Sequence, residues 1–145
     1  MMQVSRKVDY ALRAVLYLAA QPADHPAPVS EIASRRRIPK KFLEKIIKDL
    51  IRVGIVASHR GARGGYTLTR PASQVSFREV IEAVEGPISL NVCVTEQRDC
   101  SVVSSCNMQR VWLEGQRRVL EYFSGMTLAD VNPPFTLNNP EQASV

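Results

Sequence analysis

Apolar residues recur every three or four positions along the first third of the chain, and this period predicts helices. Three prolines in "QPADHPAP" interrupt the pattern after residue 21. Ser30 is expected to cap a short second helix, "EIASRRR", on which Ile32 and Ala33 face inward. The first helix is predicted over about 4–21, with one face formed by Val8, Ala11, Leu12, Val15, Leu18 and Ala19.

A third helix is predicted over "KKFLEKIIKDLIRVG", with Pro39 at its first position and Gly54 at its end. Its outer side carries cations three or four residues apart, which makes a basic stripe. A short helix, a tight turn and a second helix with a basic outer face are typical of a helix-turn-helix. The inner face is apolar and consists of Leu43, Ile46, Ile47 and Leu50.

The next segment, "IVASHRGARGGYTLTR", alternates apolar and polar residues on both sides of a glycine-rich tip. This pattern predicts a two-stranded hairpin whose tip carries Arg60 and Arg63. A basic hairpin after a helix-turn-helix is typical of a winged helix. In that arrangement the second helix would enter the major groove of DNA, and the wing arginines would contact the backbone or an adjacent minor groove.

The second half predicts two more helices on either side of a loop. In "SFREVIEAVEGP", Ser76 and Glu79 form a capping box and Gly86 ends the helix. A long helix is predicted from about 106 to 124, and either a symmetric partner or the first helix of the same chain would bury its apolar stripe. The stripe comprises Met108, Trp112, Val119 and Phe123, with Leu113 and Leu120 beside it.

The predicted fold is therefore mostly α with a small two-stranded β-wing. Four regions are expected: a winged helix-turn-helix over 1–86, a cysteine loop over 87–106, a dimerisation helix and turn over 107–131, and a loose tail over 132–145. At 145 residues and 45% hydrophobic content the chain has the size and core of one ordinary domain.

Charge is unevenly distributed and favours nucleic acid as the partner. Residues 1–70 carry 14 Lys and Arg against 5 Asp and Glu, whereas residues 71–145 carry 5 against 9. The first half therefore has the footprint of a polyanion binder, although a basic solvated surface is the simpler alternative. The residues predicted to contact DNA are Ser30, Arg37, Lys40, Lys41, Lys45, Lys48, Arg52, Arg60, Arg63 and Tyr66.

All three cysteines fall within fourteen residues, "CVTEQRDCSVVSSC". No membrane-length apolar run and no signal peptide is recognised, so we expect a cytoplasmic protein, in which clustered thiols are reduced and more often bind metal or react than form disulfides. The spacing of Cys93, Cys100 and Cys106 is wider than the pairs of zinc or thioredoxin-like sites. It favours an iron–sulfur cluster, with zinc and a thiol redox switch as alternatives, and a fourth ligand must come from elsewhere.

The stretch from "VDYALRAVLYLA" to Cys106 resembles the winged-helix iron–sulfur regulators that include IscR and NsrR. The match continues through "VSEIASRRRIPKKFLEKIIKDLIRVGIVASHRGARGGYTLTRP" and "EVIEAVEGP" to three cysteines before a long helix. The resemblance implies a homodimeric DNA-binding protein whose cluster tunes its affinity for DNA.

This chain departs from the IscR-like pattern in two places. The gap between its first two cysteines is one residue longer, and Gln109 stands where that pattern has a histidine ligand. The NsrR-like arrangement instead uses an aspartate from the first helix of the partner subunit, a position that Asp9 matches. That ligand would favour a 4Fe–4S cluster over a 2Fe–2S one. Alternatively, Asp9 forms an ordinary ion pair with Arg13 near the positive end of its helix.

The function expected is a transcription factor, in the first instance a repressor, that binds a near-palindromic operator as a homodimer. Its cluster would sense nitric oxide, redox state or iron–sulfur status. The alternatives are a winged-helix regulator with a direct thiol or zinc site, and one controlled by docking a protein partner. We expect no membrane partner and no small-molecule substrate. The chain has no glycine-rich phosphate loop, serine elbow or His-rich metal motif, so an enzyme or electron carrier is not favoured.

Overall fold

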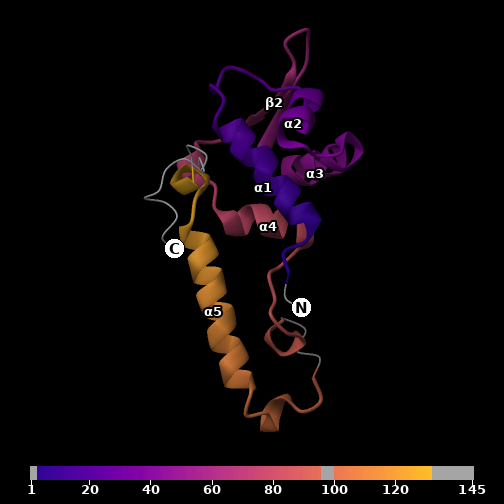
Figure 1. Ribbon diagram of the computed structural model, residues 1–145. Helices are drawn as coiled ribbons and strands as arrows, with labels where there is room; N and C mark the ends of the chain where they lie inside the picture. The colour runs from indigo at the N-terminus through magenta and orange to yellow at the C-terminus, as the bar shows by residue number, and fades with distance from the viewer. Residues whose placement is uncertain (1–2, 96–99, 132–145) are drawn as a thin grey trace, which may run out of the picture.

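The computed structural model describes residues 3–95 and 100–131, which form a head and a helical arm (Figure 1). The head gathers the first four helices around a two-stranded hairpin, and the long fifth helix extends away from it. The elements are α1 (Arg6–Ala19), α2 (Val29–Arg36), α3 (Lys40–Arg52), β1 (Val56–His59), β2 (Gly65–Leu68), α4 (Phe77–Glu85) and α5 (Gln109–Gly125), with short 3-10 turns η1 (Ala72–Gln74), η2 (Val92–Val94), η3 (Val103–Ser105) and η4 (Leu128–Val131).

The core lies in the head, and the predicted apolar faces build it. On α1 the predicted face is confirmed, although Leu12 and Ala19 at its edges are half-buried. Ile32 of α2 is also fully buried. Because each helix turns one apolar stripe inward, the opposite sides of α2 and α3 are left for solvent or a ligand. The inner face of α3 is 2% exposed or less at Leu43, Ile46, Ile47 and Leu50.

The turn between α2 and α3 is fixed by backbone hydrogen bonds. The helix α2 begins at Val29 with Pro28 as its cap, so the prediction that Ser30 caps it was wrong. The Pro28 carbonyl accepts bonds from the amides of the first turn, and Ser30 lies exposed within that turn. At the other end Arg37 takes the left-handed conformation, with φ 53°, and turns the chain into α3.

The helix α3 begins one residue later than predicted, with Pro39 as its cap rather than its first residue. Gly54 ends the region as expected. Its φ of 77° lets the amide of Ile55 reach the Leu50 carbonyl at 2.9 Å, which satisfies an end carbonyl of the helix. The chain therefore leaves α3 in a direction that leads straight into the first wing strand.

The predicted wing is confirmed as an antiparallel hairpin in which Val56 pairs with Leu68 and His59 with Gly65. A further bridge joins β2 to the segment before α2, because Ala27 and Tyr66 exchange backbone hydrogen bonds of 3.0 and 2.9 Å. The base of the wing is thus held to the helix-turn-helix through backbone as well as side chains.

Gly65 is required at this bridge. A Cβ atom there would lie 2.5 Å from the Ala27 carbonyl carbon and 2.6 Å from its oxygen. We expect Gly65→Ala to lower the free energy of unfolding by about 1–3 kcal/mol, because the clash is with paired backbone that cannot move aside. Thermal unfolding followed by circular dichroism tests this. Gly125→Ala is the control, since an added Cβ there meets nothing within 4 Å; equal melting temperatures for the two variants would contradict the prediction.

The capping box of α4 is confirmed. The Ser76 hydroxyl accepts from the Glu79 amide, and the Glu79 carboxylate accepts from the Ser76 amide at 2.8 Å and from Arg70 at 2.7 Å. Burial alone raises the pKa of Glu79. The hydrogen bonds from Ser76 and Arg70 outweigh it and hold the pKa below its usual range.

The stabilising contribution of Glu79 should therefore depend on pH. It is fully present above the unfolded pKa, near 4.5, and is lost as pH falls through the lower folded pKa. We expect Glu79→Gln to lower the melting temperature at pH 7 and to have progressively less effect under acid conditions. Glu44→Gln, at an exposed position on α3, is the control. A deficit that is constant from pH 7 to pH 3 would contradict this assignment.

The arm, α5, has no buried residue, although its sequence is rich in apolar side chains. Val119 and Phe123 are half-buried beside the N-terminal end of α1 and the 86–90 segment, so part of the predicted stripe packs within the chain. The predicted tail, 132–145, lies outside the described residues. Among the described helices none is both long and apolar enough to cross a membrane. The large apolar residues of the arm that are exposed are Met108, Val111, Leu113 and Tyr122.

Candidate nucleic-acid interface and cysteine loop

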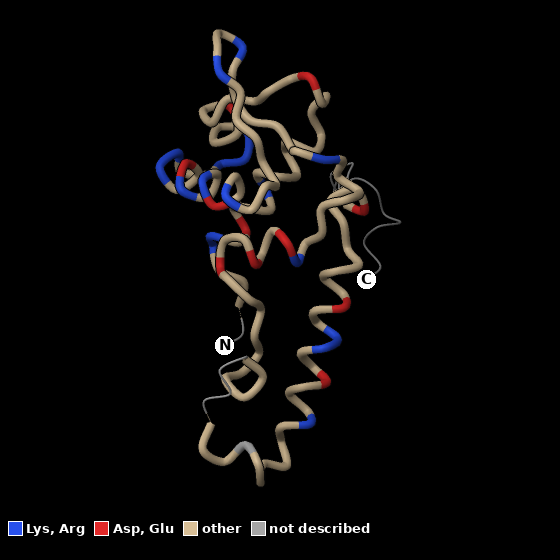
Figure 2. The backbone as a smooth tube through the Cα atoms, turned by 180° about the vertical axis from the view of Figure 1, so that it is seen from behind, with Lys and Arg blue, Asp and Glu red and all other residues tan. Residues whose placement is uncertain are grey.

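The basic stripe of α3 faces outward. Arg52 is partly neutralised by Asp49, at 3.2 Å, but its side chain stays 70% exposed. Figure 2 shows Lys and Arg gathered over this part of the head and at the tip of the wing, whereas on α5 they alternate with acidic residues. One side of the head thus has the charge that DNA phosphates attract. The cations of the stripe, Lys41, Lys45, Lys48 and Arg52, are all exposed, as is Lys40 at the start of the helix.

The remaining predicted DNA contacts surround this stripe. Ser30 and Arg37 are exposed on and after α2, and Arg60 and Arg63 are exposed at the wing tip. Tyr66 differs because it is half-buried at the base of the wing, where its backbone pairs with the segment before α2. The cations of α3 and of the wing are therefore exposed, and Tyr66 lies at the joint between the wing and the segment before α2.

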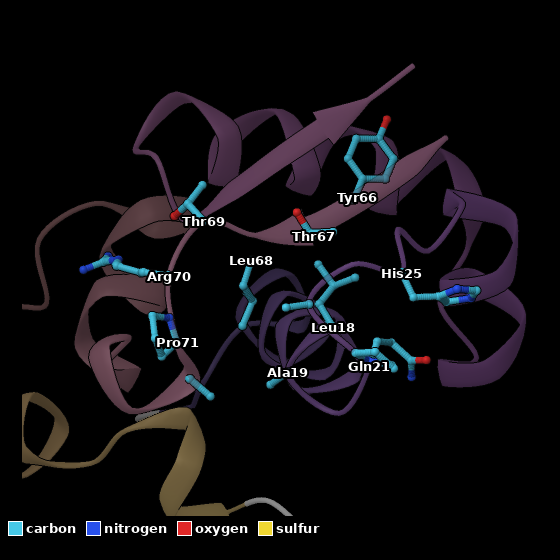
Figure 3. A pocket seen from close by; sticks show the side chains of 13 residues that line it. Leu18, Ala19, Gln21, His25, Tyr66, Thr67, Leu68, Thr69, Arg70 and Pro71 are labelled. Atoms are coloured by element: carbon cyan, nitrogen blue, oxygen red, sulfur yellow. The ribbon is translucent and has the colours of Figure 1, made fainter. Parts of the chain in front are cut away.

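A hollow of about 410 Å³ lies behind the wing, between the end of α1, β2 and η1. Leu18 and Leu68 face each other across it, with His25 and Gln21 to one side (Figure 3). Arg70 also lines it but is engaged by Glu79. The hollow contains none of the three cysteines, and Arg70 apart its lining consists of apolar residues, His25 and uncharged polar groups.

The N-terminal end of α1 links α3 to α4. Lys7 Nζ lies 2.9 Å from Asp49 Oδ2 of α3 and donates to the Val84 carbonyl of α4 at 2.6 Å. The Ser5 hydroxyl donates to Glu85, also at the end of α4, at 2.5 Å. A displacement of the last turn of α4 would therefore move Lys7 and its contact with α3, the second helix of the helix-turn-helix and hence its recognition helix. Sequence reasoning missed Lys7 because its partners are distant along the chain.

The segment that leads from α4 to the cysteines is held by the arm. Gln116 of α5 accepts from the Leu90 amide at 2.9 Å and donates to the Ile88 carbonyl at 2.5 Å. Glu82 also accepts from the Ile88 amide, at 3.3 Å. The start of the cysteine loop is thus fastened on one side to α5 and on the other to α4. No local pattern marked Gln116, which the sequence analysis also missed.

The three thiols are free, but the described chain does not bring them together. Cys93 is buried in η2, whereas Cys100 and Cys106 are half-buried. Within residues 3–95 and 100–131 no group of three or more His, Cys, Asp or Glu side chains is placed to hold a metal ion. Three unpaired thiols have the chemistry to ligate iron as thiolates. From their described positions they would do so only after the loop had closed around the iron.

Asp9 forms the ion pair that the sequence offered as its alternative role. Its carboxylate lies 2.6 Å from Arg13, and the two side chains remain 48% and 46% exposed. Asp9 is therefore open to solvent, and its ligation of a metal would require the Arg13 contact to break. Gln109, half-buried at the start of α5, stands beside Cys106 along one hollow of about 650 Å³.

A helix-turn-helix with a basic outer face, followed by a basic hairpin fixed to it, defines a winged-helix DNA-binding protein. Residues 4–133 match the model of the Rrf2 family, described as iron-dependent transcriptional regulators. The chain belongs to the Rrf2 family, and it is therefore a transcriptional regulator and not an enzyme.

Relatives and solved structures agree with this assignment. An rrf2-like HTH-type regulator of Rhodobacter capsulatus is 35% identical over 136 residues, covering 88% of this chain and 91% of the relative. CymR of B. subtilis, the global cysteine regulator, has a TM-score of 0.77 at 29% identity and covers 94% and 100% of the two chains. T. potens IscR has a TM-score of 0.70 at 31% identity, covering 90% and 85%. The predicted family and fold class are confirmed.

Proposed function

We propose that this chain is a homodimeric repressor whose affinity for a near-palindromic operator is set by an iron–sulfur cluster in the loop between Cys93 and Cys106. The observation that carries the proposal is a continuous set of contacts from that loop to the recognition helix. Gln116 and Glu82 hold the start of the loop. Lys7 then joins the end of α4 to α3.

Dimerisation is supported by the uncovered side of α5. Met108, Val111 and Tyr122 are 63%, 64% and 63% exposed, and they are separated by three and eleven residues, about one and three helical turns. These spacings place them on one side of the helix, as in helices that pack against a partner. A second copy of the same helix would cover this side and set the distance between two recognition helices.

The cluster would be held by Cys93, Cys100 and Cys106, with Asp9 of the partner subunit as the fourth ligand. When bound, a 4Fe–4S cluster with one oxygen ligand supplies an iron that nitric oxide or oxygen can attack. Closure of the loop around the cluster would move the segment that Gln116 holds. Lys7, which joins the end of α4 to α3, would transmit this displacement to α3. This shifts the population between two dimer shapes with different operator affinities.

Iron and acid-labile sulfide, counted per chain after anaerobic purification, test the cluster. We expect about four of each and a visible charge-transfer absorption. Asp9→Ala should lower both counts or alter the spectrum, whereas Asp24→Ala, in the exposed proline-rich turn, should change neither. A colourless wild-type protein would contradict the cluster, and an unchanged Asp9→Ala would leave the cluster but remove Asp9 from its ligands.

A direct thiol switch is the second candidate, because the described positions of the three free thiols do not converge on a common centre. In that case the cysteines would form sulfenic acid or disulfides with no iron present. Colourless protein whose operator affinity changes with peroxide and returns with dithiothreitol would establish it. Colourless protein with stoichiometric zinc would instead indicate a zinc site.

A further inference from the structure

Phe42 is the one large apolar side chain in the first two turns of α3 that the core does not use. It is 58% exposed, whereas the neighbouring Leu43 and Ile46 are fully buried. It belongs neither to the buried core nor to the partly buried apolar residues packed against that core in the described chain. A single exposed ring is common on protein surfaces, so the position of Phe42 on α3 carries the argument and not its exposure alone.

The ring lies at the edge of the basic stripe, next to the buried face of α3 that includes Ile46. Lys41 precedes Phe42, and Lys45 follows three residues later, so helical geometry makes Lys45 a neighbour of both on the same surface. Both lysines are exposed. Phe42 is also the third residue of the helix, and the N-terminal residues of a recognition helix are those that reach base edges. Lys41 and Lys45, which lie to one side of the ring, would hold the backbone phosphates while the ring points into the groove.

The groups that bases expose in the major groove indicate which base Phe42 would contact. Every base edge there presents polar donors or acceptors, and thymine alone adds an apolar group, its C5 methyl. We propose that Phe42 reads thymine in each operator half-site through this methyl group. The inference deepens the DNA-binding function and rests on it, but it does not depend on the cluster.

Deoxyuridine provides the direct test, because it pairs like thymidine but lacks the methyl. An operator is first selected from random duplex DNA with the full-length protein, then prepared with either thymine or uracil. The wild type should bind the uracil form about tenfold more weakly, from one lost methyl contact in each of two half-sites. Phe42→Ala should bind the thymine form more weakly than wild type and show no preference between the two forms.

Lys48→Ala is the matched control on the same helix. It should weaken binding to both forms equally and keep the wild-type preference for thymine, because a phosphate contact does not sense the methyl. Equal binding of both forms by wild type, or a thymine preference that survives in Phe42→Ala, would overturn the proposal. Failure of the wild type to select or bind any duplex would instead overturn DNA binding itself. Because the ring is exposed, Phe42→Ala should keep the wild-type melting temperature.

Discussion

Replacing Lys41 and Lys45 together by alanine is expected to lower operator affinity by about a thousandfold at physiological salt. Two exposed cations are lost from each recognition helix, so a dimer loses four phosphate contacts. Each contact releases a condensed counterion, and the slope of log affinity against log salt should therefore become shallower by about four. Fluorescence anisotropy of a labelled operator at several salt concentrations measures both quantities.

The control for this variant removes the same number of cations from elsewhere. Arg78 of α4 and Arg117 of α5 form ion pairs with Glu82 and Glu114, outside the helix-turn-helix and wing. Arg78→Ala with Arg117→Ala should leave the salt slope unchanged. A slope that falls equally in both double variants would show that net charge, and not the stripe on α3, governs binding.

Glutamate at Val111 and Tyr122 is expected to convert the protein to monomers and to weaken operator binding by at least a hundredfold. Both side chains are more than 60% exposed in the single chain, so the substitution places little strain on the fold. In a dimer the same positions would bury four carboxylates in an apolar contact, which is strongly unfavourable. Loss of the dimer then removes the simultaneous engagement of two half-sites. Sedimentation equilibrium gives the mass directly.

Glu121→Gln is the matched control on the arm, since Glu121 pairs with Arg117 on the charged side of α5. It should leave both mass and operator affinity unchanged. A Val111→Glu, Tyr122→Glu protein that still sediments at the wild-type mass would place the subunit contact elsewhere. A monomer that binds the operator as tightly as wild type would show that operator binding does not require two-fold recognition.

The winged helix could be predicted from sequence because its signals are local. The inner face of α3, Gly54 and the capping box of α4 each depend on residues within one or two turns, and all three are confirmed. The cap of α2 was predicted wrongly because Ser30 is a favoured capping residue. Here the backbone of Pro28, already extended, takes that position two residues earlier.

The parts of the site that join distant segments could not be predicted. Lys7 meets Val84 across 77 residues of sequence, and Gln116 meets Leu90 across 26. The local sequence around a lysine or glutamine on a helix does not indicate such a distant partner. The spacing of the three cysteines favours an iron–sulfur site, but their ligation of one centre depends on how their loop closes, which local sequence does not determine.

The contacts of the apolar stripe of α5 could likewise be predicted only in part from the sequence. Periodicity grouped Trp112, Val119 and Phe123 as a surface for either a partner or the first helix. In the structure Val119 and Phe123 are half-buried beside the start of α1. The uncovered side is the adjacent one, marked by Val111 and Tyr122. A helix with so wide an apolar face can serve both contacts, and only tertiary packing separates them.

Operator affinity of cluster-loaded and cluster-free protein, measured anaerobically at one fixed salt concentration, tests the central claim most directly. The account predicts a difference of at least about tenfold, because a cluster that reorganises the loop must favour one dimer shape over the other. The account further predicts that Gln116→Ala makes the operator affinities of the cluster-loaded and cluster-free protein more alike, while both still bind the operator. Equal affinities of the loaded and cluster-free wild type would contradict regulation through the loop.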